Sequence, residues 1–390
     1  MKKGKFVRLV LLLSVLLASC QTPPPPPPRI VVVPPVGKPS PDFMVSKWEM
    51  LPDWNTQDLS ASWPALKQSC RALRFRPVWL PICAAAAKVS NDDVAAQRSF
   101  YETWFTPYQV FNPDGTDTGL ITGYYEPLLK GSRTHSKRFA FPIYAPPDDM
   151  LDVDMGDLFP QFRGQHVRGR LVGKRVVPYF NRAEIDAGLD TALKGHELFW
   201  VENPVELFFL QIQGSGRIEL EDGKRVMIGY AEQNGHNYAS IGKKLIEMGE
   251  LKPEEASMQG IKNWADKNPE RLFTLLGQNP SYVFFRELPD TISAPLGALG
   301  VPLTNEYSIA VDPHIIPLGV PVFLATTQPN STDKLDRLVF AQDTGGAIKG
   351  AVRADFFWGF GDIAAVRAGS MKQSGKMWVL FPRGGEPTLN

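Results

Sequence analysis

The sequence has few cysteines, few histidines and almost no net charge, and each shortage excludes a class of function. Its 390 residues include only 3 Cys and 5 His, and the histidines form no HExxH or similar pair. This scarcity argues against a zinc hydrolase, and we expect neither a metal nor a cofactor. The formal net charge is +1. The chain as a whole therefore generates no field that would recruit nucleic acid or acidic lipid.

The apolar run near the N-terminus, residues 9–18, is too short for a comfortable membrane span. Basic residues precede it and the segment ends at Leu17-Ala18-Ser19-Cys20, so we interpret residues 1–20 as a secretory signal. Its end resembles the lipobox of bacterial lipoproteins, which implies lipidation of Cys20 and attachment to the membrane through it. Gln21 in place of Asp implies an outer-membrane anchor that faces the periplasm. The alternative is an ordinary signal peptide with a coincidental cysteine.

Proline is concentrated directly after this signal, from Pro23 to Pro28 and onward to Pro41. Because proline donates no backbone hydrogen bond and favours extended conformations, we expect residues 21–45 to form a tether. The rest of the chain is long enough for a sizeable core and two domains.

Helical spacing dominates the stretch from Trp63 to Phe105, and Asp92-Asp93 can cap a helix there. Cys70 and Cys83 lie in the same stretch and could form a disulfide in an oxidising compartment.

The pattern changes to strands from Thr118. Residues 119–125 read as a strand that ends at Glu126-Pro127. Residues 126–212 are rich in Pro, Asp, Arg and Gly, which suggests an inserted second domain. We expect a short helix at 181–188, capped by Asn181, and an apolar strand at 205–212 (VELFFLQI). Further expectations are a hairpin at 222–223, helices at 238–249, 254–268 and 269–277, and strands from 282 to the end.

Two acidic residues lie in the glycine-rich stretch 341–361. Asp343 follows an apolar strand, and Gly345 and Gly346 can adopt positive φ values that let the backbone turn beside it. Asp355 precedes three aromatic residues, and aromatic surroundings raise the pKa of a carboxyl group. A carboxyl group that is protonated near neutral pH can act as a general acid. The alternative is that both aspartates only hydrogen-bond turn amides.

Six short segments together carry a specific resemblance. They are residues 122–127 (TGYYEP), 213–216 (QGSG), 233–236 (QNGH), 279–285 (NPSYVFF), 311–319 (VDPHIIPLG) and 342–350 (QDTGGAIKG). In this order, from about Asp114 to Pro382, they resemble the membrane-bound lytic transglycosylase A family. The C-terminal part, about 300–382, also resembles the double-psi β-barrel domains named for three aspartates.

The resemblance implies a mixed, β-rich α+β fold. A large domain with a double-psi β-barrel and flanking helices would comprise residues 46–125 and 213–390. A smaller β domain, residues 126–212, would be inserted within it. A peptidoglycan strand would lie in the groove between the two.

The resemblance also implies a lytic exotransglycosylase. This enzyme cleaves the β-1,4 bond between N-acetylmuramic acid and N-acetylglucosamine without net hydrolysis, because the muramyl C6 hydroxyl attacks C1 and leaves a 1,6-anhydro end. A single residue can protonate the glycosidic oxygen and then accept the C6 proton. That residue would be Asp355, supported by Asp343 and Asp312. Candidates to line the groove are Thr122, Gly123, Tyr124, Tyr125, Gln213, Gly214, Ser215, Lys349 and Trp358.

Two other functions stay open. One is a noncatalytic peptidoglycan-binding lipoprotein on the same barrel, since fold alone does not decide function. The other is a muramidase-type hydrolase, whose product is heavier than an anhydro product by one water. The presence of Asp355 beside Asp343 favours an enzyme. Other wall enzymes could be partners, and we expect no binding to nucleic acid.

Overall fold

The computed structural model describes residues 43–163 and 167–383, which belong to one compact unit, Ser40–Asn390. The predicted signal, the lipobox with Cys20 and most of the predicted tether lie outside the described residues. Residues 43–45 form strand β1 (Phe43–Val45), so the predicted tether ends before residue 45. No helix among the described residues is long and apolar enough to cross a membrane.

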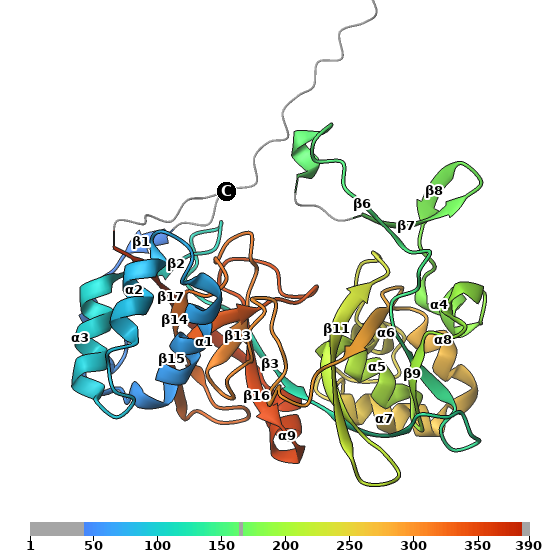
Figure 1. Cartoon of the computed structure of the whole chain (residues 1–390). Coiled ribbons are helices and arrows are strands. Elements are labelled where there is room, and N and C mark those ends of the chain that lie inside the picture. The colour runs from blue at the N-terminus through green and yellow to red at the C-terminus, as the bar shows by residue number, and fades with distance from the viewer. Residues whose placement is uncertain (1–42, 164–166, 384–390) are drawn as a thin grey trace, which may run out of the picture. The chain divides into compact units, whose positions relative to one another are not determined.

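An eight-stranded sheet forms the first part of the fold (Figure 1). In order along the sheet, its strands are β1, β2 (Phe105–Val110), β17 (Lys372–Pro382), β14 (Pro321–Thr327), β15 (Lys334–Asp343), β13 (Ser308–Ala310), β16 (Ala354–Phe360) and β3 (Gly119–Glu126). β3 also pairs with β17, so the six strands from β17 to β3 close into a ring. The predicted barrel is therefore confirmed.

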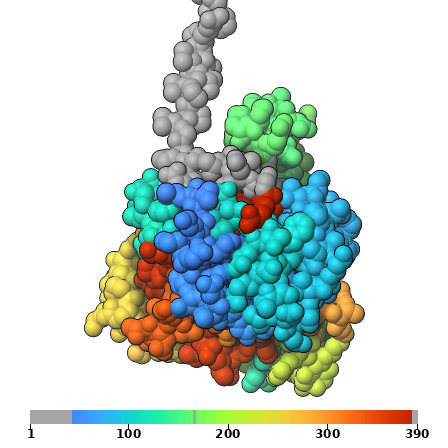
Figure 2. Space-filling view, turned by 90° about the vertical axis from the view of Figure 1, so that its left-hand side faces the viewer, coloured from blue at the N-terminus to red at the C-terminus, as the bar shows by residue number. Residues whose placement is uncertain are grey.

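Three helices, α1 (Trp63–Leu73), α2 (Trp79–Ala86) and α3 (Val94–Trp104), pack beside this sheet. Figure 2 shows that this N-terminal layer, coloured blue to cyan, forms much of one face of the molecule. Gln342 of β15 is buried beneath α1 and donates to the Ala65 carbonyl and the Ser69 hydroxyl. Short 3₁₀ helices precede α1 at Trp48–Met50, Trp54–Thr56 and Ser60–Ser62.

The structure confirms the helical prediction for this stretch. Asp93 caps α3 by accepting a hydrogen bond from the amide of Ala96. Cys70 of α1 and Cys83 of α2 are joined by a disulfide, with 5.5 Å between their Cα atoms.

A second, six-stranded sheet follows in the chain. In order, its strands are β12 (Val283–Glu287), β11 (Arg225–Gln233), β10 (Ser215–Glu219), β4 (Leu128–Ser132), β9 (Glu197–Val201) and β5 (Phe141–Tyr144). The inserted domain was predicted to end at residue 212, but the six-stranded sheet extends beyond that residue. β10 pairs with β4, and the later strands β11 and β12 continue the same sheet. Helices α5 (Pro204–Gln213), α6 (Ile241–Glu247), α7 (Met258–Lys267) and α8 (Leu272–Leu276) accompany it, with a 3₁₀ turn at Pro269–Arg271.

A three-stranded sheet, β6 (Leu151–Val153), β7 (Val167–Val172) and β8 (Arg175–Pro178), lies between β5 and β9 in the sequence. Helix α4 (Arg182–Asp186) follows it, capped by Asn181 as predicted. Short 3₁₀ helices lie at Pro160–Phe162 and Thr191–Leu193. The predicted hairpin at residues 222–223 is confirmed by the antiparallel pairing of β10 with β11.

Two predictions of secondary structure are wrong. Residues 205–212, expected as a strand, lie in helix α5, where Asn203 caps the first turn and Gly214 ends the helix with a φ of 74°. The final part of the chain is not all strand, because helix α9 (Asp362–Ser370) follows β16.

Candidate active site

Two carboxyl groups face the same side of the barrel because of strand register. β13 lies between β15 and β16, and its residue Ala310 is opposite both Asp343 of β15 and Asp355 of β16. On the far side of Asp355, β3 places Thr122 opposite it. Asp343, Ala310, Asp355 and Thr122 thus form one row across four strands. Since neighbouring strands are ~4.8 Å apart, the Cα atoms of the two aspartates are separated by about 10 Å.

Asp355 is half-buried and has one hydrogen-bonded carboxyl oxygen. The hydroxyl of Thr122 donates to its Oδ1 over 2.6 Å. Burial raises the pKa of Asp355 above its usual value, while the Thr122 hydroxyl and the charge of Arg353 oppose this rise. Within the described residues, no protein group hydrogen-bonds Oδ2 of Asp355. This oxygen is therefore available to exchange a proton with a bound molecule.

Asp343 is also half-buried, but both of its carboxyl oxygens accept hydrogen bonds. The amide of Ala298 donates to Oδ1 and the hydroxyl of Tyr124 donates to Oδ2, each over 2.9 Å. Burial raises the pKa of Asp343 to about 6, and the negative charge of Asp355 adds to the rise, although these hydrogen bonds oppose it. Asp343 is thus held in place by the protein.

Strand β3 supplies a hydroxyl to each carboxyl group. Thr122 and Tyr124 are two residues apart, so their side chains lie on the same face of the strand. Below them, Tyr124 packs in a small apolar cluster with Leu303, Ala310, Ile348 and Phe357, and its ring centroid is 5.1 Å from that of Phe357. Burial, with the nearby charge of Asp343, holds the pKa of Tyr124 well above its usual value, so Tyr124 stays a donor.

Asp312 stabilises the loop that follows Asp343. It is buried and accepts hydrogen bonds from the amides of His314 and Gly350. Lys349 is more than half exposed, and its Nζ lies 4.0 Å from Oδ1 of Asp312. The positive φ expected at Gly345 and Gly346 is not observed; within this loop it occurs at Gly350, with a φ of 113°. The amide of Gly350, at this positive φ, donates to Oδ2 of Asp312.

Tyr125, Gln213, Gly214 and Ser215 lie where β3 meets the end of α5 and the start of β10. The side-chain oxygen of Gln213 accepts a hydrogen bond from the amide of Tyr125, and the Tyr125 hydroxyl contacts the sulfur of Met258 over 3.6 Å. Gly214 caps the end of α5 and Ser215 is buried at the start of β10. These contacts join β3 to α5 and α7.

Gly123 and Trp358 serve packing. Trp358 is buried beside Phe356, and its indole N–H donates to the sulfur of Met371. A Cβ on Gly123 would lie 2.7 Å from the Trp358 ring nitrogen and 3.0 Å from the backbone of Ala368. Glycine is therefore needed where β3 approaches α9. Because Trp358 is buried in this packed core, its ring has little surface to offer a ligand, and its predicted contact with one stays a prediction.

Sequence reasoning missed two groups near the carboxyl pair. The amide of Ala298, which binds Asp343, belongs to a loop held against β15, where the Leu299 amide donates to the Gln342 carbonyl. The turn residues Gly297 and Gly300 could have indicated such a loop. Arg353 was not among the predicted site residues, although it lies two residues before Asp355 in the sequence. Its positive charge opposes the rise in the pKa of Asp355.

The arrangement suits proton transfer. Two desolvated carboxyl groups with raised pKa values lie in one row across the sheet. Both oxygens of Asp343 accept hydrogen bonds, whereas within the described residues only one oxygen of Asp355 does. Among residues 43–163 and 167–383, no group of three or more His, Cys, Asp or Glu side chains is placed to hold a metal ion.

Comparison with known proteins identifies the family. A family model described as "MltA specific insert domain" matches residues 120–286, and one described as "3D domain" matches residues 307–381. The membrane-bound lytic murein transglycosylase A of Escherichia coli K12 is 36% identical over 291 residues, covering 73% of this chain and 71% of that protein. The relative from Vibrio cholerae is 31% identical over 268 residues, covering 67% and 65%.

Solved structures agree with these sequence matches. MltA from Neisseria gonorrhoeae, in a monoclinic crystal form, aligns with a TM-score of 0.78 and 42% identity, covering 90% of this chain and 95% of that one. Escherichia coli MltA with bound chitohexaose aligns with a TM-score of 0.66 and 28% identity, covering 87% and 94%. The sequence relatives, the two family models and the shared fold together show that the chain belongs to the membrane-bound lytic murein transglycosylase A family.

Proposed function

We propose that the chain is a peptidoglycan lytic transglycosylase. It cleaves the β-1,4 bond between N-acetylmuramic acid and N-acetylglucosamine and leaves a 1,6-anhydromuramyl end. The observation that carries this proposal is the half-buried Asp355, whose raised pKa and free Oδ2 suit a residue that first gives and then accepts a proton. The names of the sequence relatives support the reaction class.

In the proposed mechanism Asp355 acts alone in proton transfer. Its Oδ2 protonates the glycosidic oxygen as the bond to C1 breaks. The resulting carboxylate then accepts the proton of the muramyl C6 hydroxyl as that oxygen bonds to C1. The proton returns to Asp355, so no water is consumed. Thr122 positions the acid through its bond to Oδ1.

Asp343 takes a supporting role in this proposal. Its two oxygens are already occupied by Ala298 and Tyr124, so it is less able to exchange a proton with a sugar. As a carboxylate in the same row as Asp355, it would supply negative charge that stabilises the positive charge developing on the sugar during bond breaking. Asp312 supports the site indirectly by holding the loop that carries Lys349.

The substrate proposed is a glycan strand in a groove between the barrel and the inserted domain. Chitohexaose bound to the Escherichia coli relative supports recognition of an oligosaccharide. Lys349 is exposed on the loop after Asp343, where its ammonium group can donate to sugar hydroxyl or acetamido oxygens. Tyr125, Gln213, Gly214 and Ser215 would shape the junction of the two parts rather than touch the reacting sugar.

We also propose membrane association, for which the relatives' names give support. The finer proposal is lipidation of Cys20 and anchoring to the outer membrane, with the folded part in the periplasm. It depends on the basic residues, the short apolar run and the Leu-Ala-Ser-Cys sequence at positions 17–20.

Mass spectrometry of the products tests the reaction. Purified protein is incubated with isolated sacculi, and the released muropeptides are analysed intact. A transglycosylase leaves anhydro ends, which are lighter by one water than the reducing ends left by a hydrolase. Products with reducing ends alone would contradict the proposal and indicate a muramidase. Tight binding to sacculi without any release would indicate a noncatalytic wall-binding protein.

A further inference from the structure

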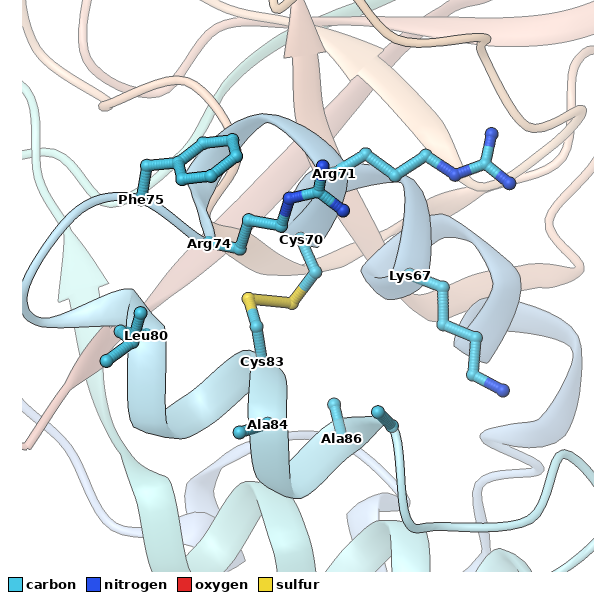
Figure 3. Close-up of a pocket in the computed structure, with 10 residues that line it drawn as sticks. Lys67, Cys70, Arg71, Arg74, Phe75, Leu80, Cys83, Ala84 and Ala86 are labelled. Atoms are coloured by element: carbon cyan, nitrogen blue, oxygen red, sulfur yellow. A yellow bond between two sulfur atoms is a disulfide. The ribbon is translucent and has the colours of Figure 1, made fainter.

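The turn between α1 and α2 carries a surface that the proposed active site does not use. We call it the basic-apolar surface; it comprises Lys67, Arg71, Arg74, Phe75, Arg76, Val78 and Leu80. A hollow of about 610 Å³ lies between the two helices at this surface. Figure 3 shows the disulfide crossing between the helices, with Phe75 and Leu80 at one end of the hollow and Lys67 at the other.

Helical periodicity builds this surface. Lys67, Arg71 and Arg74 are spaced by four and three residues, so they lie along one side of α1 and its end. Ala84 and Ala86 of α2 line the hollow together with Ala87, which caps the helix, and their small side chains leave it open. The Cys70–Cys83 disulfide fixes the two helices at this point.

Large apolar side chains on this surface face solvent. Phe75 is 77% exposed, Leu80 60% and Val78 49%. The guanidinium carbon of Arg74 lies 4.8 Å from the Phe75 ring centroid, so basic and aromatic groups are side by side. Grouped exposed apolar residues with polar neighbours usually mark a surface that another molecule covers.

The cations of this surface lack acidic partners. Within the described part of the chain, Arg71, Arg74 and Arg76 form no ion pair, and Lys67 donates to the side-chain oxygen of Asn91 over 2.7 Å. The net charge of the whole chain is only +1, so the positive charge here is a local concentration. A negatively charged partner would complement it.

We propose that the basic-apolar surface docks on a lipid bilayer that contains anionic headgroups. Arg71, Arg74 and Arg76 would contact lipid phosphates, and Phe75 and Leu80 would enter the boundary between headgroups and acyl chains. Interfacial binding depends on this combination of apolar burial with attraction to anionic lipid. An aromatic ring between arginines suits the interface, where amphipathic and basic groups gather.

The chain outside the described residues favours a bilayer as the occupant. Phe43 is 23 residues after Cys20, and a proline-rich chain extends by ~3.1 Å per residue, so the tether reaches about 70 Å. A lipid anchor at Cys20 would therefore confine this surface to within about 70 Å of the bilayer and raise its effective concentration there. This step rests on the proposed lipidation, whereas the exposed side chains and unpaired charges do not.

Vesicle binding tests the inference without the anchor. The protein used starts at residue 21, which leaves out the signal and Cys20 and keeps the compact unit from residue 40 to 390. It is sedimented with vesicles of phosphatidylcholine alone or with 30% phosphatidylglycerol. We expect binding to the anionic vesicles at low salt and its loss at high salt.

Substitutions locate the contact. Arg71→Glu with Arg74→Glu should weaken binding to anionic vesicles by at least about tenfold, and Phe75→Ser by about tenfold. Leu158→Ser is the matched control, because Leu158 is 75% exposed in another part of the chain, and it should bind as the unsubstituted protein does. No binding to anionic vesicles, or equal binding by the double Arg variant, would overturn the inference in favour of another partner such as an acidic peptide.

A fluorescence measurement tests the inference independently, in case the charge-reversal or Phe75→Ser variants do not fold. Since Cys70 and Cys83 are paired, Phe75→Cys offers a single free thiol for an environment-sensitive fluorophore. Its emission should shift to the blue with anionic vesicles, and the same label at Leu158→Cys should not respond. An unchanged spectrum at position 75 would contradict insertion. Vesicle binding by a protein that cleaves no peptidoglycan would refute the proposed enzyme and leave this inference standing.

Discussion

Asp343 makes the stability of the protein depend on pH in a direction opposite to that of most aspartates. Its pKa is raised to about 6 in the folded protein, against the usual 3.8. Well below pH 3.8 the carboxyl group of Asp343 is protonated in both the folded and the unfolded state, so its ionisation does not change the free energy of unfolding. As the pH rises from about 4 to about 6, the unfolded chain ionises first, so the folded state progressively loses stability.

The size of this effect follows from the shift. A difference of about 2.2 pKa units corresponds to about 3 kcal/mol at 1.36 kcal/mol per unit, and solvent access to the half-buried carboxyl makes this an upper value. Asp343→Asn removes the ionisation. The Asn oxygen can still accept from Ala298, and its NH₂ can donate to the Tyr124 oxygen, so the variant keeps both contacts.

The assay is urea unfolding of wild type and variant between pH 4 and pH 8. We expect Asp343→Asn to become more stable relative to wild type as the pH rises, by about 1–3 kcal/mol at pH 7. Asp58→Asn is the control, because hydrogen bonds from Ser60 lower the pKa of Asp58 below 3.8 and the ionised carboxylate therefore stabilises the fold. This stabilisation is lost only as the pH falls below the usual pKa, so Asp58→Asn should be less stable than wild type by a nearly constant amount over most of the assayed range. A pH-independent difference for Asp343→Asn would refute the raised pKa and the desolvation behind it.

Three further changes test other parts of the account. Thr122→Val removes the donor to Asp355, so the pKa of Asp355 should rise and the pH–activity profile should move by about one unit to higher pH; an unmoved profile would argue against this hydrogen bond. Cys20→Ala should release active protein from membranes in fractionation, and continued membrane association would argue against the lipid anchor. Replacing Cys70 and Cys83 by Ser should lower unfolding free energy by about 2–4 kcal/mol; equal urea midpoints would contradict this.

Helix α5 shows where local sequence was ambiguous. An apolar run of eight residues fits a buried strand or a buried helix equally well. The residues on either side of the run indicate a helix. Asn203 accepts hydrogen bonds from two amides of the first turn, Pro204 occupies the first helical position and Gly214 terminates the helix. Helices α1 and α3 were predictable because polar residues on one face made the helical period visible, whereas α2 (WLPICAAA) has no polar face.

The candidate site was predictable in its residues but not in its arrangement. Asp343 and Asp355 stand out by their neighbours in the sequence. Their row with Ala310 and Thr122 depends on register between strands far apart in the chain, including a β-bulge beside Ala310. Local patterns do not specify such register.

The positions of the aromatic residues after Asp355 were likewise not predictable from local sequence. Strand alternation sends Phe357 toward the carboxyl row and turns Phe356 and Trp358 into the main core. Helix α9 covers Trp358 through two small buried residues, Ala364 and Ala368, which gave too weak a pattern to predict a helix. The expected raised pKa of Asp355 is found, with burial as its cause.

The central claim is that Asp355 gives and accepts the proton in each turnover. The direct measurement is the rate of 1,6-anhydromuropeptide release from sacculi by wild type, Asp355→Asn and Asp343→Asn, with binding to sacculi measured in parallel. We predict that Asp355→Asn binds normally but is slower by at least about 10²-fold, whereas Asp343→Asn is less affected. Release by Asp355→Asn at a rate near wild type would contradict it, and if Asp343→Asn were then inactive, the two roles would be exchanged.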